Sequence, residues 1–121
     1  MNIEELRDYC ISKPAVTESF PFDENTLVFK VAGKMFLLTD LVDAFSINIK
    51  NTPEKVIELK EQYPSVLPGY HMNKIYWVTV MIDGTITDKM LKQWIDESYN
   101  LIISGFTRKQ NELYQETSGK M

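Results

Sequence analysis

The stretch from Pro68 to Trp77, PGYHMNKIYW, gathers many of the side chains in this chain that could do chemistry. Its ten residues hold the only histidine, His71, together with Asn73, Lys74, two tyrosines and one of the two tryptophans. Imidazole transfers protons near neutral pH, and lysine and aromatic side chains bind phosphates and stack on bases. An apolar run follows directly, so the stretch is expected to be a loop that leads into a strand.

Metal binding is disfavoured by the supply of ligands. A structural zinc site needs about four nitrogen or sulfur ligands, and the chain has one histidine and one cysteine, Cys10. The remaining alternative is an iron or calcium site made of the carboxylates near the amino terminus: Glu4, Glu5, Asp8, Asp23 and Glu24. These lack the spacing of a calcium loop and fit a solvated helix face. We expect no metal and no cofactor.

Nucleophilic catalysis lacks a complete set of groups. His71 could pair with Cys10, but Cys10 belongs to the apolar stripe of the first expected helix. A pair of His71 with Ser46 or Ser65 would need a third group to orient the imidazole. The glycines are isolated turn residues, and they form no phosphate-binding or dinucleotide motif. We expect that the protein is not an enzyme.

The balance of charge argues against a basic domain of the usual kind. Acidic residues outnumber basic ones by 17 to 13, and affinity for nucleic acid depends on lysine and arginine displacing counterions. The imbalance is concentrated at the start of the chain. Residues 1–24 have a net charge of −4, whereas residues 25–74, with six lysines and five carboxylates, have a net charge of +1. A local basic surface in the middle of the chain is therefore compatible with the sequence.

The first half of the chain predicts one helix and three strands. Asn2 can cap the helix reciprocally with Glu5, and Pro14 ends it. Residues 14–25 are expected to be irregular. Residues 26–32 and 35–39 alternate as two strands, joined by Gly33-Lys34 in a type II′ turn, and residues 44–50 form a third strand. The polar positions opposite the apolar ones are Lys30, Ser46, Asn48 and Lys50.

The second half predicts two helices separated by one or two strands. Thr52-Pro53 begins a helix that Pro64 ends, and residues 65–74 form a loop with at most a short extended piece. Residues 75–82 are a strand. Thr87 or Asp88 caps a long helix that stops at Gly105, and Thr107 with Gln110 could form another capping box.

This order of elements predicts a two-layer α+β domain. Helix, three strands, helix, one or two strands and helix would form an antiparallel sheet that helices cover on one face. A single domain is expected over residues 1–106. Residues 107–121 are expected to be a loosely ordered tail or a short helix.

A sheet that is covered on one face leaves another face that could bind a partner. Lys30, Lys50 and their polar neighbours would lie on it, Lys34 would be at the hairpin tip, and Lys74 and Trp77 would enter from the loop and the last strand. Such a set can meet phosphates and stack on bases. Each member also has a structural interpretation, since Trp77 fits a core position and Lys34 a solvated turn.

Several short segments resemble, in order and spacing, the MmcQ/YjbR family of small bacterial proteins. They are SFPF at 19–22, LVFKVAGKMF at 27–36, SINIK at 46–50, TPEKVIEL at 52–59, PGYHMNK at 68–74, WVTV at 77–80 and SY at 98–99. The resemblance covers about residues 3–106. It implies an α-β3-α-β2-α domain, of a kind compared with CyaY/frataxin-like and secretion-chaperone-like folds.

The resemblance also implies DNA binding through a double-wing arrangement of hairpins, a function that the family carries by inference from fold. It supplies no catalytic residues. The acidic balance of this chain departs from the DNA-binding expectation. The candidate nucleic-acid or partner-binding residues that match the family pattern are Lys34, Lys50, Tyr70, His71, Asn73, Lys74 and Trp77.

Three hypotheses follow. The first is a non-enzymatic module that binds DNA weakly through the open sheet face. The second is a protein-interaction or chaperone-like adaptor, or a homodimer, that uses this face or the last helix. The third is a small-ligand or enzymatic site at His71. No apolar run reaches the roughly 20 residues that span a bilayer, and the acidic start, MNIEELRDYC, lacks the apolar segment of a signal peptide. We therefore expect a cytoplasmic protein.

Overall fold

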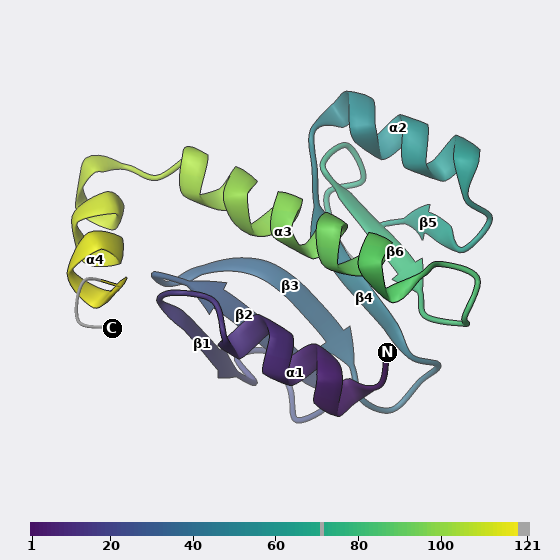
Figure 1. The fold of residues 1–121 in the computed structure, drawn as a ribbon, viewed down its shortest axis with the longest axis horizontal. Coiled ribbons are helices and arrows are strands. Elements are labelled where there is room, and N and C mark those ends of the chain that lie inside the picture. The colour runs from purple at the N-terminus through teal and green to yellow at the C-terminus, as the bar shows by residue number, and fades with distance from the viewer. Residues whose placement is uncertain (71, 119–121) are drawn as a thin grey trace.

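The structure is a computed structural model that describes residues 1–70 and 72–118. Within them, four helices pack with a six-stranded antiparallel sheet of order β1-β2-β3-β4-β6-β5 (Figure 1). The predicted α+β class is confirmed. The elements are α1 Ile3–Ile11, β1 Val16–Ser19, β2 Thr26–Val31, β3 Lys34–Asp40, β4 Ser46–Lys50, α2 Pro53–Gln62, β5 Val66–Pro68, β6 Trp77–Met81, α3 Asp88–Ser104 and α4 Arg108–Ser118.

The helices begin where side chains can satisfy their first backbone N–H groups. At α1, the Asn2 side chain accepts the Glu5 N–H at 2.8 Å, and the Glu5 carboxylate accepts the Asn2 N–H at 3.3 Å. Thr52 caps α2, with Pro53 as the first helical residue, and Thr87 caps α3. These starts confirm the predicted caps and settle the choice between Thr87 and Asp88.

Strand β1 lies in a segment that the sequence predicted to be irregular, and that prediction was wrong. Residues Val16–Ser19 pair antiparallel with β2, in the register Val16↔Val31 to Ser19↔Val28. Prolines 14 and 21 flank the segment and make it resemble a loop. A strand at the edge of a sheet tolerates such neighbours, because only one of its sides pairs with another strand.

The hairpin between β2 and β3 also differs from the prediction. The turn residues are Ala32 (φ 47°) and Gly33 (φ 85°), and Lys34 is already the first residue of β3, paired with Val31. Positive φ at both central positions is the type I′ geometry, which suits strand twist as well as the expected type II′ turn does. The turn is therefore one residue earlier than predicted. Lys34 consequently belongs to β3, and its pairing with Val31 decides on which face of the sheet its side chain lies.

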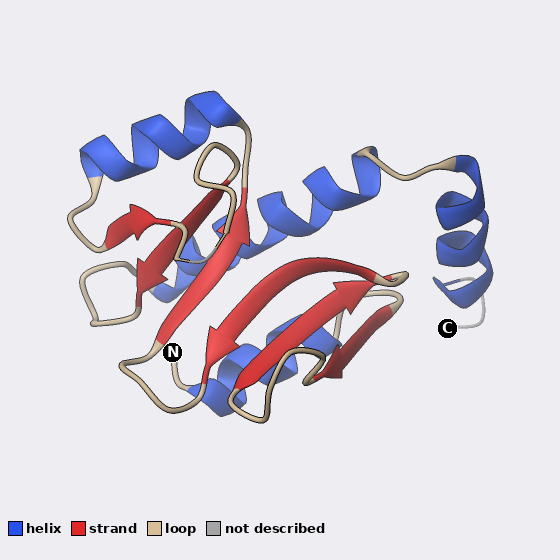
Figure 2. Cartoon of the chain, turned by 180° about the vertical axis from the view of Figure 1, so that it is seen from behind, coloured by secondary structure: helices blue, strands red, loops and turns tan. Residues whose placement is uncertain are grey.

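The main core lies between the sheet and helices α1, α2 and α3, and Figure 2 shows the sheet with α1 and α3 behind it. Buried side chains from β2, β4 and β6 pack there against Leu6, Trp94 and Ile95. The other face has a small core of its own, formed by Val28, Leu38 and Trp77. We call this side the open face. Within the described residues, no helix is both long and apolar enough to cross a membrane.

Candidate nucleic-acid interface

The loop between β5 and β6, which we call the 69–76 loop, is tied closely to β6. The Gly69 N–H donates to the Trp77 carbonyl at 3.2 Å, and the Trp77 N–H donates to the Asn73 carbonyl at 2.9 Å. The Asn73 side chain accepts the Ile75 N–H at 2.9 Å, so this candidate residue shapes the loop. Met72 packs against the small core on the open face. His71, another candidate residue of this loop, lies outside the described residues.

A hydroxyl on β6 joins the 69–76 loop to the middle of the sheet. Thr79 donates to the Asn48 side-chain oxygen at 2.5 Å and accepts the Tyr70 N–H at 3.0 Å. Thr79 is buried, whereas the Tyr70 side chain is 72% exposed. The backbone of Tyr70 is therefore held in place while most of its side chain is exposed to solvent.

Lys50 is fixed by contacts on both sides of its strand. It lies opposite Trp77 in the β4–β6 register, and its ammonium is 5.5 Å from the centre of the Tyr76 ring. Its backbone N–H donates to the Ser98 hydroxyl at 2.9 Å, and Ser98 donates to the Phe36 carbonyl at 2.6 Å. Ser98 is fully buried, so α3 fixes the point at which Lys50 leaves the sheet.

Three lysines share one end of the open face, which we call the basic end: Lys30, Lys50 and Lys74. Lys30 lies near the end of β2, next to the turn of the hairpin, and Lys50 is the last residue of β4. Strand β3 runs between these two strands, and Lys74 lies in the 69–76 loop. Lys74 is exposed, and Lys30 and Lys50 are half-buried. None of the three forms an ion pair with a described residue. Their positive charge is therefore available to an anionic partner.

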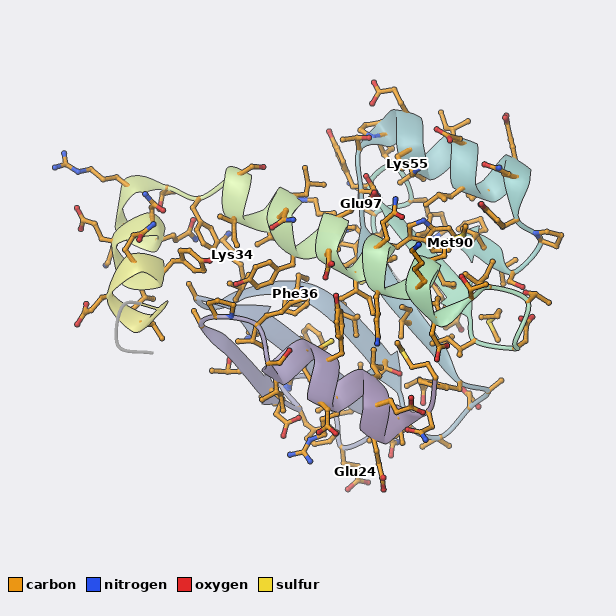
Figure 3. The ribbon with its side chains drawn as sticks, in the orientation of Figure 1. Glu24, Lys34, Phe36, Lys55, Met90 and Glu97 are labelled. Atoms are coloured by element: carbon orange, nitrogen blue, oxygen red, sulfur yellow. The ribbon has the colours of Figure 1, made fainter. Side chains whose placement is uncertain are left out.

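Lys34 does not join this group. It pairs with Val31, whose side chain is buried in the main core, and paired residues in an antiparallel ladder project to the same side of the sheet. Lys34 consequently leaves from the helix side, and Figure 3 shows it at the hairpin tip on the side of α4. Of the seven candidates, Trp77 is a core residue of the open face, and Lys50, Tyr70 and Lys74 present exposed or half-buried side chains around it.

The opposite end of the sheet is acidic, a feature that the sequence interpretation missed. Thr26 pairs with Asp40, and the Leu41 N–H donates to the Asn25 carbonyl at 2.9 Å, so loops 20–25 and 41–45 lie side by side. We call the carboxylates of these loops, together with that of Asp40 at the end of β3, the acidic end: Asp23, Glu24, Asp40 and Asp43. Figure 3 shows Glu24 well away from Lys34.

Hydrogen bonds keep part of the acidic end charged. The Asn25 and Thr26 N–H groups donate to Asp23 at 2.9 and 2.8 Å and lower the pKa of its carboxyl below the ordinary value. Large apolar side chains are exposed on the same loops: Phe20, Phe22, Leu41 and Val42. In the sequence, this surface is indicated by two short apolar segments, SFPF at 19–22 and LV at 41–42, each of which lies beside acidic residues.

The groups considered for catalysis occupy structural positions. Cys10 is buried in the main core, and burial raises the pKa of its thiol to about 12, so the thiol is neutral near pH 8. The Ser65 hydroxyl donates a hydrogen bond to the Asp83 carboxylate, which also accepts the Thr85 N–H in the following turn. Among the described residues, no three side chains of metal-ligating type are grouped where they could hold an ion.

A polar hollow of about 460 Å³ lies between the start of α2 and α3. Figure 3 shows Lys55 and Glu97 on these two helices. The Asn51 amide donates to Glu97 at 3.1 Å, so the polar groups of the hollow bind one another. The hollow is wide open to solvent, and its lining includes Asn51, which directly follows Lys50. It offers no enclosed site for a small ligand.

These features define a small α+β domain with an antiparallel sheet, helices on one face and a polarised open face. Residues 11–101 match the family model described as YjbR. The chain belongs to the YjbR family. It is 34% identical to the uncharacterized protein YbdF of Escherichia coli O157:H7, covering 90% of each chain. It is 29% identical to the uncharacterized protein YjbR of E. coli K12, covering 93% of this chain and 97% of that one.

Solved structures show the same fold. The crystal structure of Deinococcus radiodurans protein DR2400, described as a DUF419 domain, superimposes with a TM-score of 0.86 at 40% identity, covering 93% of this chain and 87% of that chain. A crystal structure of a Pseudomonas syringae protein superimposes with a TM-score of 0.74 at 27% identity, covering 84% and 98%. The family resemblance found in the sequence is thereby confirmed.

Proposed function

We propose that this YjbR-family protein is a non-enzymatic module that binds DNA weakly through the basic end of its open face. The observation that supports this most directly is the grouping of Lys30, Lys50 and Lys74, without carboxylate partners among the described residues, beside the exposed Tyr70 and Tyr76 rings. Ammonium groups meet phosphates, and exposed aromatic rings stack on accessible bases. The hairpin would contribute Lys30 from β2, because Lys34 projects from the helix side.

The size of the site limits the affinity. Neutralising three phosphates would give a slope of log K against log salt of about −2 for single strands and about −3 for duplex DNA. Between 50 and 200 mM salt, affinity would then fall by about 20- to 40-fold. The net charge of −4 opposes binding further. We therefore expect a weak complex that is measurable only at low salt.

A pair of matched substitutions tests the proposal. Lys50→Glu and Lys34→Glu change the net charge equally, but only Lys50 lies at the basic end. Fluorescence anisotropy with a labelled single strand and a labelled duplex, at 20 to 200 mM salt, should show a large loss for Lys50→Glu and a small one for Lys34→Glu. Equal losses for both variants would show that only net charge matters. No binding by the natural chain at 20 mM salt would refute the proposal.

Protein interaction is the second candidate function, and one observation favours it. Phe20, Phe22, Leu41 and Val42 expose 45 to 67% of their surface on two adjacent loops. Clustered apolar side chains on a surface are typical of sites that bind other proteins. These four side chains lie at the acidic end, whereas the lysines proposed to meet DNA lie at the basic end, so the two candidate functions use different ends of the same face.

A further inference from the structure

We propose that two copies of this chain associate through their open faces, with the basic end of one against the acidic end of the other. This inference goes beyond DNA binding, although both involve the basic end. It follows from the distribution of charge, the distribution of exposed apolar side chains and the symmetry of the face.

The two ends carry opposite charges that do not neutralise each other within one copy. The basic end has three lysines and the acidic end four carboxylates. Along β4 alone, Lys50 and Ser46 are four residues, or about 13 Å, apart, and the acidic loops lie beyond Ser46. This exceeds the Debye length of about 10 Å at 0.1 M salt. Each end therefore presents its charge to an outside partner.

The middle of the face is neutral. A row of paired residues crosses the strands there: Ser19, Val28, Leu38, Asn48, Thr79 and Leu67. Val28 and Leu38 belong to the small core of the open face, and Thr79 and Asn48 bind each other. No charged side chain occurs in this row, so an opposing surface would not have to bury an unpaired charge against it.

Exposed apolar side chains are concentrated around the same face. Eleven large apolar side chains among the described residues are exposed, and eight of them lie on the face or on loops at its two ends. Those at the acidic end are Phe20, Phe22, Leu41 and Val42, and those on or beside the basic end are Tyr70, Ile75 and Tyr76, while Leu67 lies in the neutral row. Apolar surface at both ends favours a partner that covers the whole face.

A second copy fits this pattern by symmetry. A twofold axis that lies between two facing sheets, along the neutral row, exchanges the two ends of the face. It brings each basic end onto an acidic end, so the complementary contact occurs twice. A basic partner would match only the acidic end, and DNA would match only the basic end. The second copy alone satisfies both with one surface.

Charge reversal at each end gives a sharp test. One variant carries Lys50→Glu and Lys74→Glu, and the other carries Glu24→Lys and Asp43→Lys. None of the four side chains forms an ion pair with a described residue, and the contact of Lys50 with the Tyr76 ring lies at the surface of the open face, so folding should be retained. In the first variant the altered basic end carries a net charge of −1 and faces an acidic end of −4. In the second the altered acidic end is neutral and faces a basic end of +3. Each variant alone therefore loses the attraction at both contacts and should be monomeric. Mixed in equal amounts, the two variants bring the unchanged acidic end of one against the unchanged basic end of the other, and should form a heterodimer through this contact.

The measurement is sedimentation velocity or light scattering at 20 to 500 μM protein. The natural chain should dimerise at 50 mM salt, and its dissociation constant should rise about tenfold or more at 500 mM, because complementary charges are screened. A control pair reverses the same number of charges elsewhere: Lys60→Glu with Lys109→Glu, and Asp8→Lys with Glu61→Lys. Each control variant should dimerise as the natural chain does.

Three outcomes would overturn the inference. They are a natural chain that stays monomeric at 500 μM and 50 mM salt, single-end variants that still dimerise, and control variants that lose dimerisation as the single-end variants do. DNA binding is separable, because Glu24→Lys with Asp43→Lys leaves the basic end intact and uncovered. If the dimer exists but this variant binds no DNA, only the proposed function fails. If the natural chain is monomeric yet binds DNA through Lys50, only the inference fails.

Discussion

Gly69→Ala should destabilise the domain through a single close approach. Gly69 is buried where the 69–76 loop leaves β5, and a methyl group there would lie 2.9 Å from both the Trp77 Cβ and the Trp77 carbonyl oxygen. Favourable carbon contacts are about 3.5–4.0 Å apart. The atoms in the way belong to the start of β6 and cannot rotate aside, so the loop must move away from the strand.

The size of the effect follows from three contributions. Overpacking costs about 1–3 kcal/mol, and weakening the Gly69 N–H bond to Trp77 costs about 0.5–1.5 kcal/mol. Replacing glycine by alanine restricts the unfolded chain and offsets about 0.4–1 kcal/mol of this. The net loss of unfolding free energy should be about 1–3 kcal/mol.

Urea unfolding followed by tryptophan fluorescence and circular dichroism measures this loss. Gly105→Ala is the matched control, because its added methyl group would be 3.7 Å from its nearest neighbour and its φ is −95°. This control should be neutral or stabilised by up to about 1 kcal/mol. Equal stability of the Gly69→Ala and Gly105→Ala variants would refute the reasoning, since the loop would then be free to leave β6.

Three further outcomes are expected. Ser98→Ala should lower the unfolding free energy by about 1–3 kcal/mol, because it leaves the backbone N–H of Lys50 without its acceptor. The control Ser104→Ala, at an exposed position, should change the unfolding free energy by less than about 0.5 kcal/mol. Urea unfolding measures both. Thr79→Val should speed hydrogen exchange at the Tyr70 amide while β1 amides keep their rates; unchanged exchange at Tyr70 would contradict the bond to Thr79. The Cys10 thiol, with its pKa raised to about 12, should react with a disulfide reagent at pH 8 about tenfold or more slower in the folded than in the urea-unfolded chain, and equal rates would contradict its burial.

Local patterns predicted much of the fold. Alternation placed Leu27, Phe29 and Val31 toward one side, and these residues face the helices. The helix starts at Asn2, Thr52 and Thr87 depend on hydrogen bonds within one turn, so they are readable from a few neighbouring residues.

The candidate site was predictable only in part. Lys50 was placed on the open face because its strand alternates regularly, and Trp77 was correctly weighed as a core residue. Lys34 was assigned to the same surface by its place in the turn, and the turn proved to be one residue earlier. A shift of one residue in a strand reverses the side on which a side chain emerges, so this position could not be decided from sequence.

The sequence by itself determined the fold class, the starts of α1, α2 and α3, and the family, because these depend on periodicity, capping and the order of motifs along the chain. Only the tertiary structure decided that β1 is a strand, that Lys30, Lys50 and Lys74 share one end, and that two acidic loops adjoin at the other. Those arrangements depend on pairing between segments far apart in the chain. The register of such pairing is set by turn type and a β-bulge between Phe29 and Lys30, which no local pattern records.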